Sequence, residues 1–485
     1  MVVKETYTYY SGKIPITISI EENKEEFVLV YNLTVAEISK NTEILLDKIR
    51  DEVISKAGIR ITDVTDLKKS EYLEKRFREE ITYLLSKYLP GVSDKTKDFL
   101  ITYLVQKSLG LGKIELLLDD NNLEEIVINN ASESAWVYHH KHGWLKTNIY
   151  LENEEQIKHY SALIGRKVGR SINLLSPLLD AHLETGERIN ATLYPVSSKG
   201  NTLTLRKFSA KPITITNMLK EKTISLSAAS LIWAGIEYEL SALVAGGTAS
   251  GKSVLLGALC SFFPPNQRIV SIEDVRELVL PKYLHWIPMV TREANVEGKG
   301  EVTMLDLIIN SLRMRPDRIV VGEIRRQREA ETLFEAMHTG HSVYATLHAN
   351  DTEETINRLL NPPISVPKSS LPAISMIIMM HRNRRTGVRR VLQVSEIEKN
   401  STGKVLMQYD LKNDNMNTIN KSSRLIPELQ MQTGLTSQEI NQDLKEKSLI
   451  LSYLAKKNID DVDNIGKIVG TYYTHKNEIL RMIKK

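Results

Sequence analysis

The sequence predicts an α/β protein built around a mainly parallel sheet with flanking helices. Apolar β-type runs alternate with helical stretches between residues 217 and 399, and a glycine-rich loop joins one such run to a helix. The preceding region mixes strands and helices, as in an α+β domain with a helical portion, and the following region is polar and mostly helical. The expected regions are 1–110, 111–208, 217–399 and 400–485, with a linker at 209–216.

The composition is that of a globular protein. Hydrophobic residues make up 42% and charged residues 26% of the 485 residues, which excludes global disorder and collagen-like repeats. The net charge of +4 is too small to predict nucleic-acid binding by bulk charge. The single cysteine, Cys260, excludes an internal disulfide framework and a zinc site built from several cysteines.

No segment of the sequence predicts a membrane-spanning helix. The longest apolar-rich run, Leu371–Met380, is about half the roughly 18 residues that a span needs, and Pro372 and Ser375 interrupt it. The N-terminal segment alternates polar and apolar side chains and lacks a signal-peptide core. We expect a cytoplasmic protein that associates with a membrane peripherally, through partners.

The flanking regions show both strand and helix patterns. Residues Thr6–Val30 indicate short strands, because β-type residues alternate with polar ones. Apolar residues at three- and four-residue spacing predict helices over Leu67–Leu89 and Asp94–Leu109. Pro212 favours an extended connector over Ser209–Thr216. Further expected elements are strands at Leu123–Asn129, Ala135–His140 and Asn201–Phe208, a helix at Glu154–Arg166, and a helical tail opened by a capping box at Thr436-x-x-Glu439.

Residues 246–253 fit the phosphate-binding pattern G-x-x-x-x-G-K-[ST], between the apolar run Ser241–Ala245 and a helix. Glycines let the backbone curl so that N–H groups point toward a polyphosphate, and the helix adds its positive N-terminus. Lys252 is expected to reach the β- and γ-phosphates, and Ser253 to bind Mg²⁺. An ordinary glycine-rich turn is the weaker alternative, because chance matches occur in only about 1–2% of such chains. The expected nucleotide-binding residues are Gly246, Gly247, Thr248, Ala249, Ser250, Gly251, Lys252, Ser253 and Val254.

Two acidic residues follow expected strands downstream of this loop. Glu323 comes after Arg318–Val321, and Glu273 comes after Arg268–Ile272. Hydrolysis of a nucleotide needs a carboxylate at a neighbouring strand end, either to hold Mg²⁺ or to orient water. For each acid, the alternative is a helix N-cap or a solvated loop residue.

Two histidines flank the expected strand Ser342–Leu347. The spacing of His341 and His348 matches no zinc pattern, so each fits a packed structural histidine. The strand should run toward the nucleotide edge of the sheet, so His348 also fits a contact with a γ-phosphate.

These motifs together resemble the secretion ATPase superfamily, the cytoplasmic motors of type II secretion, type IV pili and archaeal surface filaments. The segments RIVSIEDVRELVL, LRMRPDRIVVGEIR and AMHTGHSVYATLHAND resemble the family's Asp box, Walker B and His box, in the family's order. Upstream, LEEIVIN, GWLKTN, LLDAHLETGERINATLYPVSSKGNTLTLRKF and PITITNML are similar to the archaeal branch. The single cysteine means that the tetracysteine insert of many bacterial members is absent, which again favours that branch. An archaellum motor and an archaeal pilus assembly ATPase both stay open.

The resemblance implies a RecA-like ATPase domain that uses ATP and Mg²⁺. It implies a homo-oligomeric ring, usually a hexamer, that powers filament assembly or protein secretion. A polytopic membrane platform protein would be its partner, and nucleic acid would not be one. The connector at Pro212 would be the hinge between the regions.

The resemblance also assigns roles to individual residues. Lys252 and Ser253 would bind the phosphates and Mg²⁺, and Glu323 would be the Walker B acid that shares the metal ion. Glu273 is a candidate for activating water. His348, and less surely His341, would contact the γ-phosphate. Arg188 and Arg206 match N-terminal-domain arginines that can approach the nucleotide, and surface solvation or a local ion pair is the alternative for each.

Three other function classes stay open at this point. A nucleic-acid motor could use the arginine-rich segment 382–390, which otherwise predicts a solvated hairpin tip or a contact with an acidic or membrane-platform partner. The near-neutral net charge argues against such a motor. A small-molecule kinase is disfavoured, because such kinases are usually one compact domain and a long region precedes this loop. A non-hydrolysing scaffold would show near-zero turnover that Lys252→Ala leaves unchanged.

Overall fold

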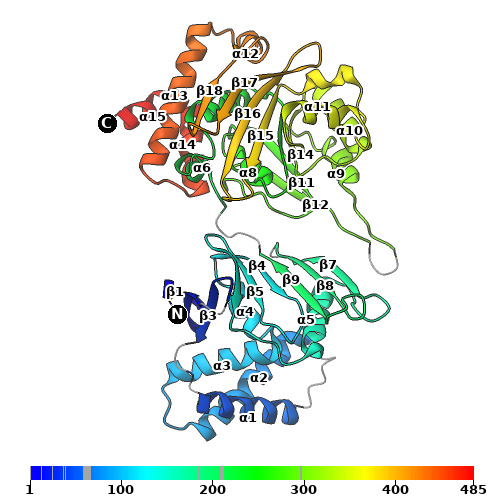
Figure 1. The fold of residues 1–485 in the computed structure, drawn as a ribbon, viewed down its shortest axis with the longest axis vertical. Helices are drawn as coiled ribbons and strands as arrows, with labels where there is room; N and C mark the ends of the chain where they lie inside the picture. The colour runs from blue at the N-terminus through cyan, green and yellow to red at the C-terminus, as the bar shows by residue number, and fades with distance from the viewer. Residues whose placement is uncertain are drawn as a thin grey trace. The chain divides into compact units, whose positions relative to one another are not determined.

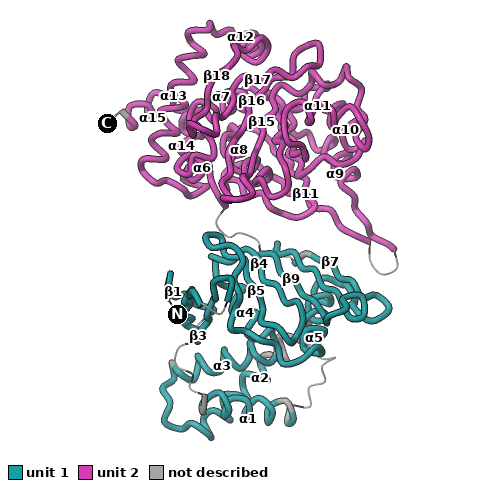
Figure 2. Tube along the Cα trace, viewed as in Figure 1, with its two compact units in different colours: residues 1–210 teal, residues 211–485 magenta. Residues whose placement is uncertain are grey.

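The computed structural model describes residues 2–12, 14–23, 26–35, 38, 40–57, 67–183, 186–207, 212–294 and 298–484. The chain divides into two compact units, residues 1–210 and 211–485 (Figure 2). The boundary falls within the segment where the sequence predicts a linker, although part of that segment lies outside the described residues. The finer divisions at residues 110 and 399 stay predictions.

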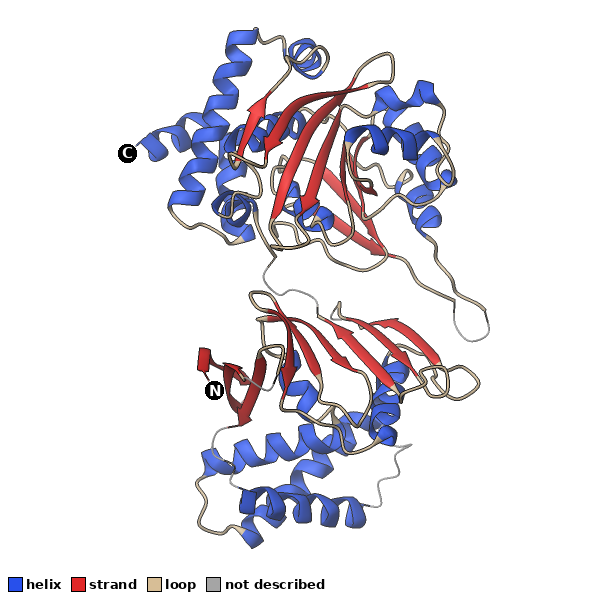
Figure 3. Cartoon of the chain, viewed as in Figure 1, coloured by secondary structure: helices blue, strands red, loops and turns tan. Residues whose placement is uncertain are grey.

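The described part of the first unit contains a nine-stranded sheet with helices packed against it (Figures 1 and 3). The strand order is β1-β2-β3-β6-β5-β4-β9-β8-β7, and every neighbouring pair is antiparallel except β3 with β6. The strands are β1 (Val2–Ser11), β2 (Ile14–Glu22), β3 (Val30–Val35), β4 (Leu123–Ile128), β5 (Trp136–His139), β6 (Gly143–Thr147), β7 (Leu178–His182), β8 (Arg188–Thr192) and β9 (Thr202–Arg206). The helices are α1 (Lys40–Ala57), α2 (Leu67–Tyr88), α3 (Asp94–Leu109), α4 (Lys113–Leu118) and α5 (Glu154–Lys167).

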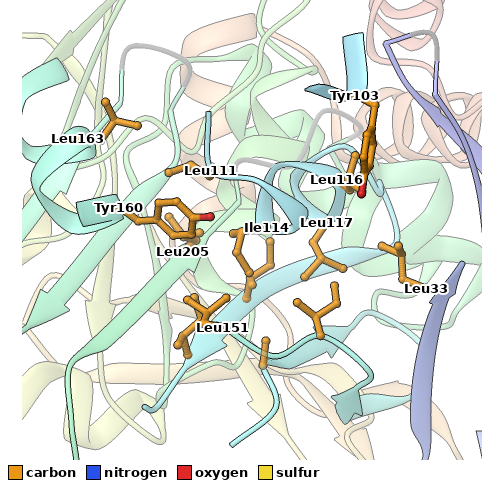
Figure 4. Close-up of a cluster of buried hydrophobic side chains, with 14 of the residues drawn as sticks. Leu33, Tyr103, Leu111, Ile114, Leu116, Leu117, Leu151, Tyr160, Leu163 and Leu205 are labelled. Carbon is orange, nitrogen blue, oxygen red and sulfur yellow. The ribbon is translucent and has the colours of Figure 1, made fainter. Parts of the chain in front are cut away.

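The short helix α4 lies at the centre of the first unit's core. Its apolar side chains Ile114, Leu116 and Leu117 are buried. Figure 4 shows these side chains in one cluster with Tyr160 of α5 and Leu205 of β9. The core therefore joins helices and strands from distant parts of the first unit.

The described part of the second unit contains another nine-stranded sheet, in the order β12-β11-β13-β14-β10-β15-β16-β17-β18. The pairs from β12 to β15 are parallel, and the remaining three are antiparallel. The strands are β10 (Ala242–Gly246), β11 (Arg268–Glu273), β12 (His285–Val290), β13 (Arg318–Val321), β14 (Ser342–His348), β15 (Met376–Arg382), β16 (Arg389–Ile397), β17 (Gly403–Asp410) and β18 (Asn415–Thr418). The helices are α6 (Ile215–Lys220), α7 (Leu226–Glu237), α8 (Lys252–Cys260), α9 (Met304–Ser311), α10 (Gln327–His338), α11 (Thr352–Leu360), the 3₁₀ helix η2 (Lys368–Ala373), α12 (Leu425–Thr433), α13 (Ser437–Lys456), α14 (Val462–Thr474) and α15 (Lys476–Lys484).

Helices cover both faces of the second sheet. All five residues of β10 are buried, as expected for a central parallel strand. Its side chains alternate between the faces: Ala242 and Val244 pack in the core with α7, α8 and α12 to α15, whereas Leu243 and Ala245 pack in the core with α9, α10 and α11. The α/β fold class predicted from the sequence is confirmed.

Most of the expected elements are present with small shifts at their ends, but one prediction was wrong in detail and some strands were not anticipated. The connector expected to extend to Thr216 ends earlier, because Thr214 and Asn217 form a capping box that begins α6 at Ile215. The sheet also continues beyond residue 399, through β17 and β18, before the helical tail begins. The edge strand β12, which contains Pro288, is not among the strands that the sequence predicts. The capping box at Thr436 and Glu439 is confirmed.

Among the described residues, no helix combines the length and the apolar character needed to cross a membrane.

Candidate nucleotide-binding site

The phosphate-binding motif forms a tight loop between β10 and α8. Ala249 and Gly251 adopt positive φ angles of 56° and 91°, which turn the backbone into the start of the helix. A β-carbon at Gly246 would lie 2.5 Å from Ser250 Oγ and 2.7 Å from the main-chain oxygen of Met380. Only glycine fits at position 246, because the chain packs there directly against Ser250 of the same loop and against Met380 of β15.

The N-terminus of α8 opens from this loop. The first N–H groups of a helix have no acceptor within the helix, so those of Lys252, Ser253 and Val254 can bind an anion. Lys252 Nζ donates to the main-chain oxygen of Gly247 at 3.1 Å, so its ammonium group lies across the loop. Burial lowers the pKa of Lys252, and the negative charge of Glu323 opposes that effect. The carboxylate of Glu323 thus stabilises the charged form of Lys252.

Both predicted acids lie at the same edge of the sheet as the loop. Glu273 ends β11, and Glu323 follows β13, which is paired with β11 in parallel. The strand ends are close, because a β-carbon at Gly322 would lie 3.5 Å from Glu273 Cα. The carboxyl ends of parallel strands are the usual location of ligand sites in open α/β sheets.

Glu273 is the more deeply buried acid, with 2% of its surface exposed. Its Oε1 accepts hydrogen bonds from the backbone N–H groups of Glu277 and Leu278 at 2.8 and 3.0 Å. Its Oε2 is buried and has no hydrogen-bond partner among the described residues. Burial raises the pKa of Glu273 to about 7, although the two backbone N–H groups oppose this effect. One oxygen is therefore held in place while the other is available to a further donor.

Glu323 is held by Arg325, which no sequence pattern marks as a site residue. Arg325 approaches Glu323 Oε2 at 2.7 Å through one Nη, and it approaches Asp274 Oδ2 at 2.5 Å through the other. The three residues form a chain of charges along the ends of β11 and β13. The GEIR segment contains Arg325, but only the pairing of the strands shows that it bridges two acids.

His348 joins this edge, and His341 does not. His348 ends β14 opposite Gly246 in the register of β10 and β14, and its Nε2 lies 4.0 Å from Glu323 Oε1. Burial and the positive charge of Lys252 lower the pKa of His348, which favours the neutral imidazole. His341 lies before the first residue of β14, and its Nδ1 is 3.2 Å from the main-chain oxygen of Ala336. That position, at the other end of the strand, argues against a γ-phosphate contact by His341.

The two predicted arginines lie in the sheet of the first unit. Arg188 begins β8 and forms an ion pair with Asp180, with Nη2 2.7 Å from Oδ2. Arg206 ends β9, between Arg188 on one neighbouring strand and Glu125 on the other. The local ion pair, which the sequence left as the alternative for Arg188, is present.

A further arginine reaches the loop from the hairpin of β15 and β16. The Nε of Arg389 lies 3.3 Å from the main-chain oxygen of Ala249. The expected hairpin at 381–390 is confirmed, but its tip is not wholly solvated, because Arg389 contacts the loop. No local sequence signal separates Arg389 from the other arginines of the hairpin.

The site fits a magnesium ion held jointly with a nucleotide. Within the described residues, no group of three or more histidine, cysteine, aspartate and glutamate side chains is placed to hold a metal ion. Mg²⁺ is commonly bound by one or two protein ligands together with substrate phosphates. The hydroxyl group of Ser253 and the carboxylate of Glu323 are of the hard-oxygen kind that such an ion requires.

The chain is similar in sequence to a protein family and to several known proteins. The chain matches the family model described as "Type II/IV secretion system protein" over residues 113–479. An uncharacterized protein of Methanocaldococcus jannaschii is 38% identical over 348 residues, which cover 70% of this chain and 46% of that protein. A putative conjugal transfer protein of Mycobacterium tuberculosis is 33% identical over 300 residues, which cover 59% of this chain and 84% of that protein.

Among solved structures, the ATPase DotB of Legionella pneumophila is similar at 19% identity, with a TM-score of 0.42, over 74% of this chain and 94% of that chain. The chain spans about half the length of two of the Methanocaldococcus jannaschii proteins that it matches, at 46% and 56%, and 99% of a third.

Proposed function

Because this chain belongs to the type II/IV secretion system protein family, we propose that it hydrolyses ATP with Mg²⁺ to power a secretion or filament-assembly machine. The family resemblance found in the sequence is confirmed by this match. The observation that carries the proposal is the position of Glu323 beside the phosphate loop: its Oε1 lies 4.0 Å from Nε2 of His348, and His348 pairs with Gly246 of the loop. A phosphate loop and a metal-binding acid at one sheet edge are the central parts of a nucleotide hydrolase.

In this proposal, the loop and the first turn of α8 hold the phosphates. Lys252 and the backbone N–H groups at 252–254 would neutralise the β- and γ-phosphates, and Ser253 and Glu323 would hold Mg²⁺. When bound there, the ion would supply positive charge that offsets the charge of the phosphates. His348, in its neutral form, is placed to hydrogen-bond at the γ-phosphate end.

We assign the activation of water to Glu273. A carboxyl group with a pKa of about 7 can accept a proton near neutral pH, which suits a general base. Its Oε1 is fixed by two backbone N–H groups, and its Oε2 has no partner among the described residues. The attacking water would donate to Oε2. Glu323 instead is tied to Arg325, which suits a metal ligand better than a base.

The test compares ATP hydrolysis by the wild type with that by Lys252→Ala, Glu323→Gln and Glu273→Gln. Lys252→Ala is expected to lose nucleotide binding. Glu323→Gln and Glu273→Gln are expected to retain binding and to lose turnover by at least about 100-fold. Glu335→Gln is the matched control, because it removes one acid from an exposed position on α10. Hydrolysis at the wild-type rate in Lys252→Ala, Glu323→Gln and Glu273→Gln would refute the proposal.

The wider role of the chain is also a proposal. We assign it to a homo-oligomeric ring, with six copies expected, that works at the cytoplasmic face of a membrane platform protein. The support is the family match and the archaeal relative, together with the similarity to a conjugal transfer protein. Deletion of the encoding gene should remove one type of surface filament or one secreted set of proteins. Strong stimulation of hydrolysis by single-stranded DNA would instead favour a nucleic-acid motor.

A further inference from the structure

The hairpin of β15 and β16 places one arginine on the phosphate loop. Arg389, the first residue of β16, lies with its Nε 3.3 Å from the main-chain oxygen of Ala249. A β-carbon at Gly251 would lie 3.4 Å from Arg389 Cδ, so the side chain also packs along the loop's last glycine. This contact joins residues that are 140 positions apart in the sequence.

The positive charge of Arg389 is not compensated by a carboxylate within the described part of the chain. The neighbouring Arg390 is bound to Asp414 at 3.2 Å and to Tyr409 at 2.8 Å, so its charge is compensated. Arg389 has no carboxylate partner among the described residues, and its bond to Ala249 is longer than a typical N–H···O bond. Its two terminal amino groups have no bonded partner within the same residues. A cation with unused donors therefore lies against a loop built for anions.

The strand order shows which end of a nucleotide Arg389 would meet. The loop follows β10, which lies between β14 and β15 in the sheet. Glu273, Glu323 and His348 all lie on the β14 side of β10. The γ-phosphate must face these groups if they bind metal and orient water. The α-phosphate and nucleoside then extend toward the β15 side, where Arg389 lies.

We propose that Arg389 binds the α-phosphate end of the nucleotide and contributes to affinity rather than to hydrolysis. This inference rests on the proposed function of the loop. A guanidinium group bonded to a phosphate oxygen makes a charge-assisted hydrogen bond, which is stronger than a neutral one. ATP and ADP share the α-phosphate, so the contribution of Arg389 should be the same for both.

The experiment measures the binding of a fluorescent ADP analogue, mant-ADP, and competition by ATP in the full chain. Arg389→Ala should raise both dissociation constants by about 10- to 100-fold, the effect of losing one bond to a charged group. Arg389→Lys should lose less, because it keeps the charge but not the planar donor pair. Arg385→Ala is the matched control, since it removes one exposed positive charge from the same hairpin and should bind as the wild type does. In steady state, Arg389→Ala should raise KM and leave kcat within about twofold.

Each other outcome overturns the inference in a distinct way. Unchanged binding in Arg389→Ala, with normal binding by the wild type, would remove the role of Arg389 alone. A fall in kcat at constant affinity would place the arginine in the hydrolysis step. The nucleotide-free variant could also melt at a lower temperature than the nucleotide-free wild type. If the smaller folded fraction explains the whole loss of binding, Arg389 only supports the loop. Failure of the wild type to bind mant-ADP would overturn both this inference and the proposed function.

Discussion

Replacing Glu273 by glutamine is expected to flatten the dependence of the second unit's stability on pH. The wild-type carboxyl group is buried at the end of β11, where its ionised form is unfavourable. Glutamine has nearly the same shape and can accept the same two backbone hydrogen bonds, but it has no proton to lose. The substitution therefore isolates the cost of ionising this one side chain.

The magnitude follows from the pKa of Glu273, which burial raises from 4.5 to about 7 in the folded state. The folded state binds this proton more tightly than the unfolded state does. The free energy of unfolding should therefore fall as the pH rises from about 4.5 to about 7, and it should level off above that range. The difference corresponds to roughly 3 kcal/mol that the wild type loses and the variant keeps.

The assay is urea unfolding followed by tryptophan fluorescence at a series of pH values, without nucleotide. The chain has four tryptophans, and replacing Trp136 and Trp144 by phenylalanine leaves Trp233 and Trp286, which both lie in the second unit. Glu335→Gln in the same background controls for the loss of an acid at an exposed site. Parallel pH profiles for the wild type and Glu273→Gln would refute the raised pKa and, with it, the assignment of Glu273 as the base.

Three more outcomes are expected. Gly246→Ala should abolish nucleotide binding, because the added carbon would lie 2.7 Å from a main-chain oxygen of β15, whereas Gly91→Ala, which has open space around it, should bind normally in the same fluorescence titration. Lys447→Met should lower the free energy of unfolding by about 3 kcal/mol in urea, since it removes the cation that pairs with the Glu237 carboxylate, whereas Asp443 keeps Lys476 at 3.4 Å; full stability would contradict this. The resemblance to family arginines that approach the nucleotide predicts that Arg188→Ala reduces turnover by about 10³-fold at unchanged nucleotide affinity, and full activity would instead support the ion pair with Asp180 as the role of Arg188.

The phosphate loop could be predicted from the sequence because its chemistry is local. The motif places glycines, a lysine and a serine at fixed spacing within residues 246–253, and the apolar run and the helix adjoin it directly. The strand-end acids Glu273 and Glu323 could be predicted for the same reason, since each lies at or just beyond the end of an apolar run. The depth of burial of Glu273, and thus its raised pKa, depends on packing that no local pattern describes.

The residues missed by sequence reasoning are those brought to the site by pairing between distant strands. Arg325 bridges Glu323 and Asp274 only because β11 and β13 are neighbours. Arg389 reaches the loop only because β15 pairs with β10 across a long crossover. β12 was not anticipated because its side chains are half-exposed and Pro288 interrupts the pattern of an ordinary strand.

The contacts of Lys447 show that the last helices are part of the same packed core as the helix preceding the phosphate loop. Lys447, on α13, forms ion pairs with Asp443 and with Glu237 at the end of α7, the helix that directly precedes β10. Trp233, one turn earlier on α7, is fully buried and donates a hydrogen bond to Tyr473 of α14. A chain shortened before residue 437 would expose this indole to water and would remove Lys447, the ion-pair partner of the Glu237 carboxylate. Attempts to isolate a minimal nucleotide-binding fragment should accordingly keep the chain through α14.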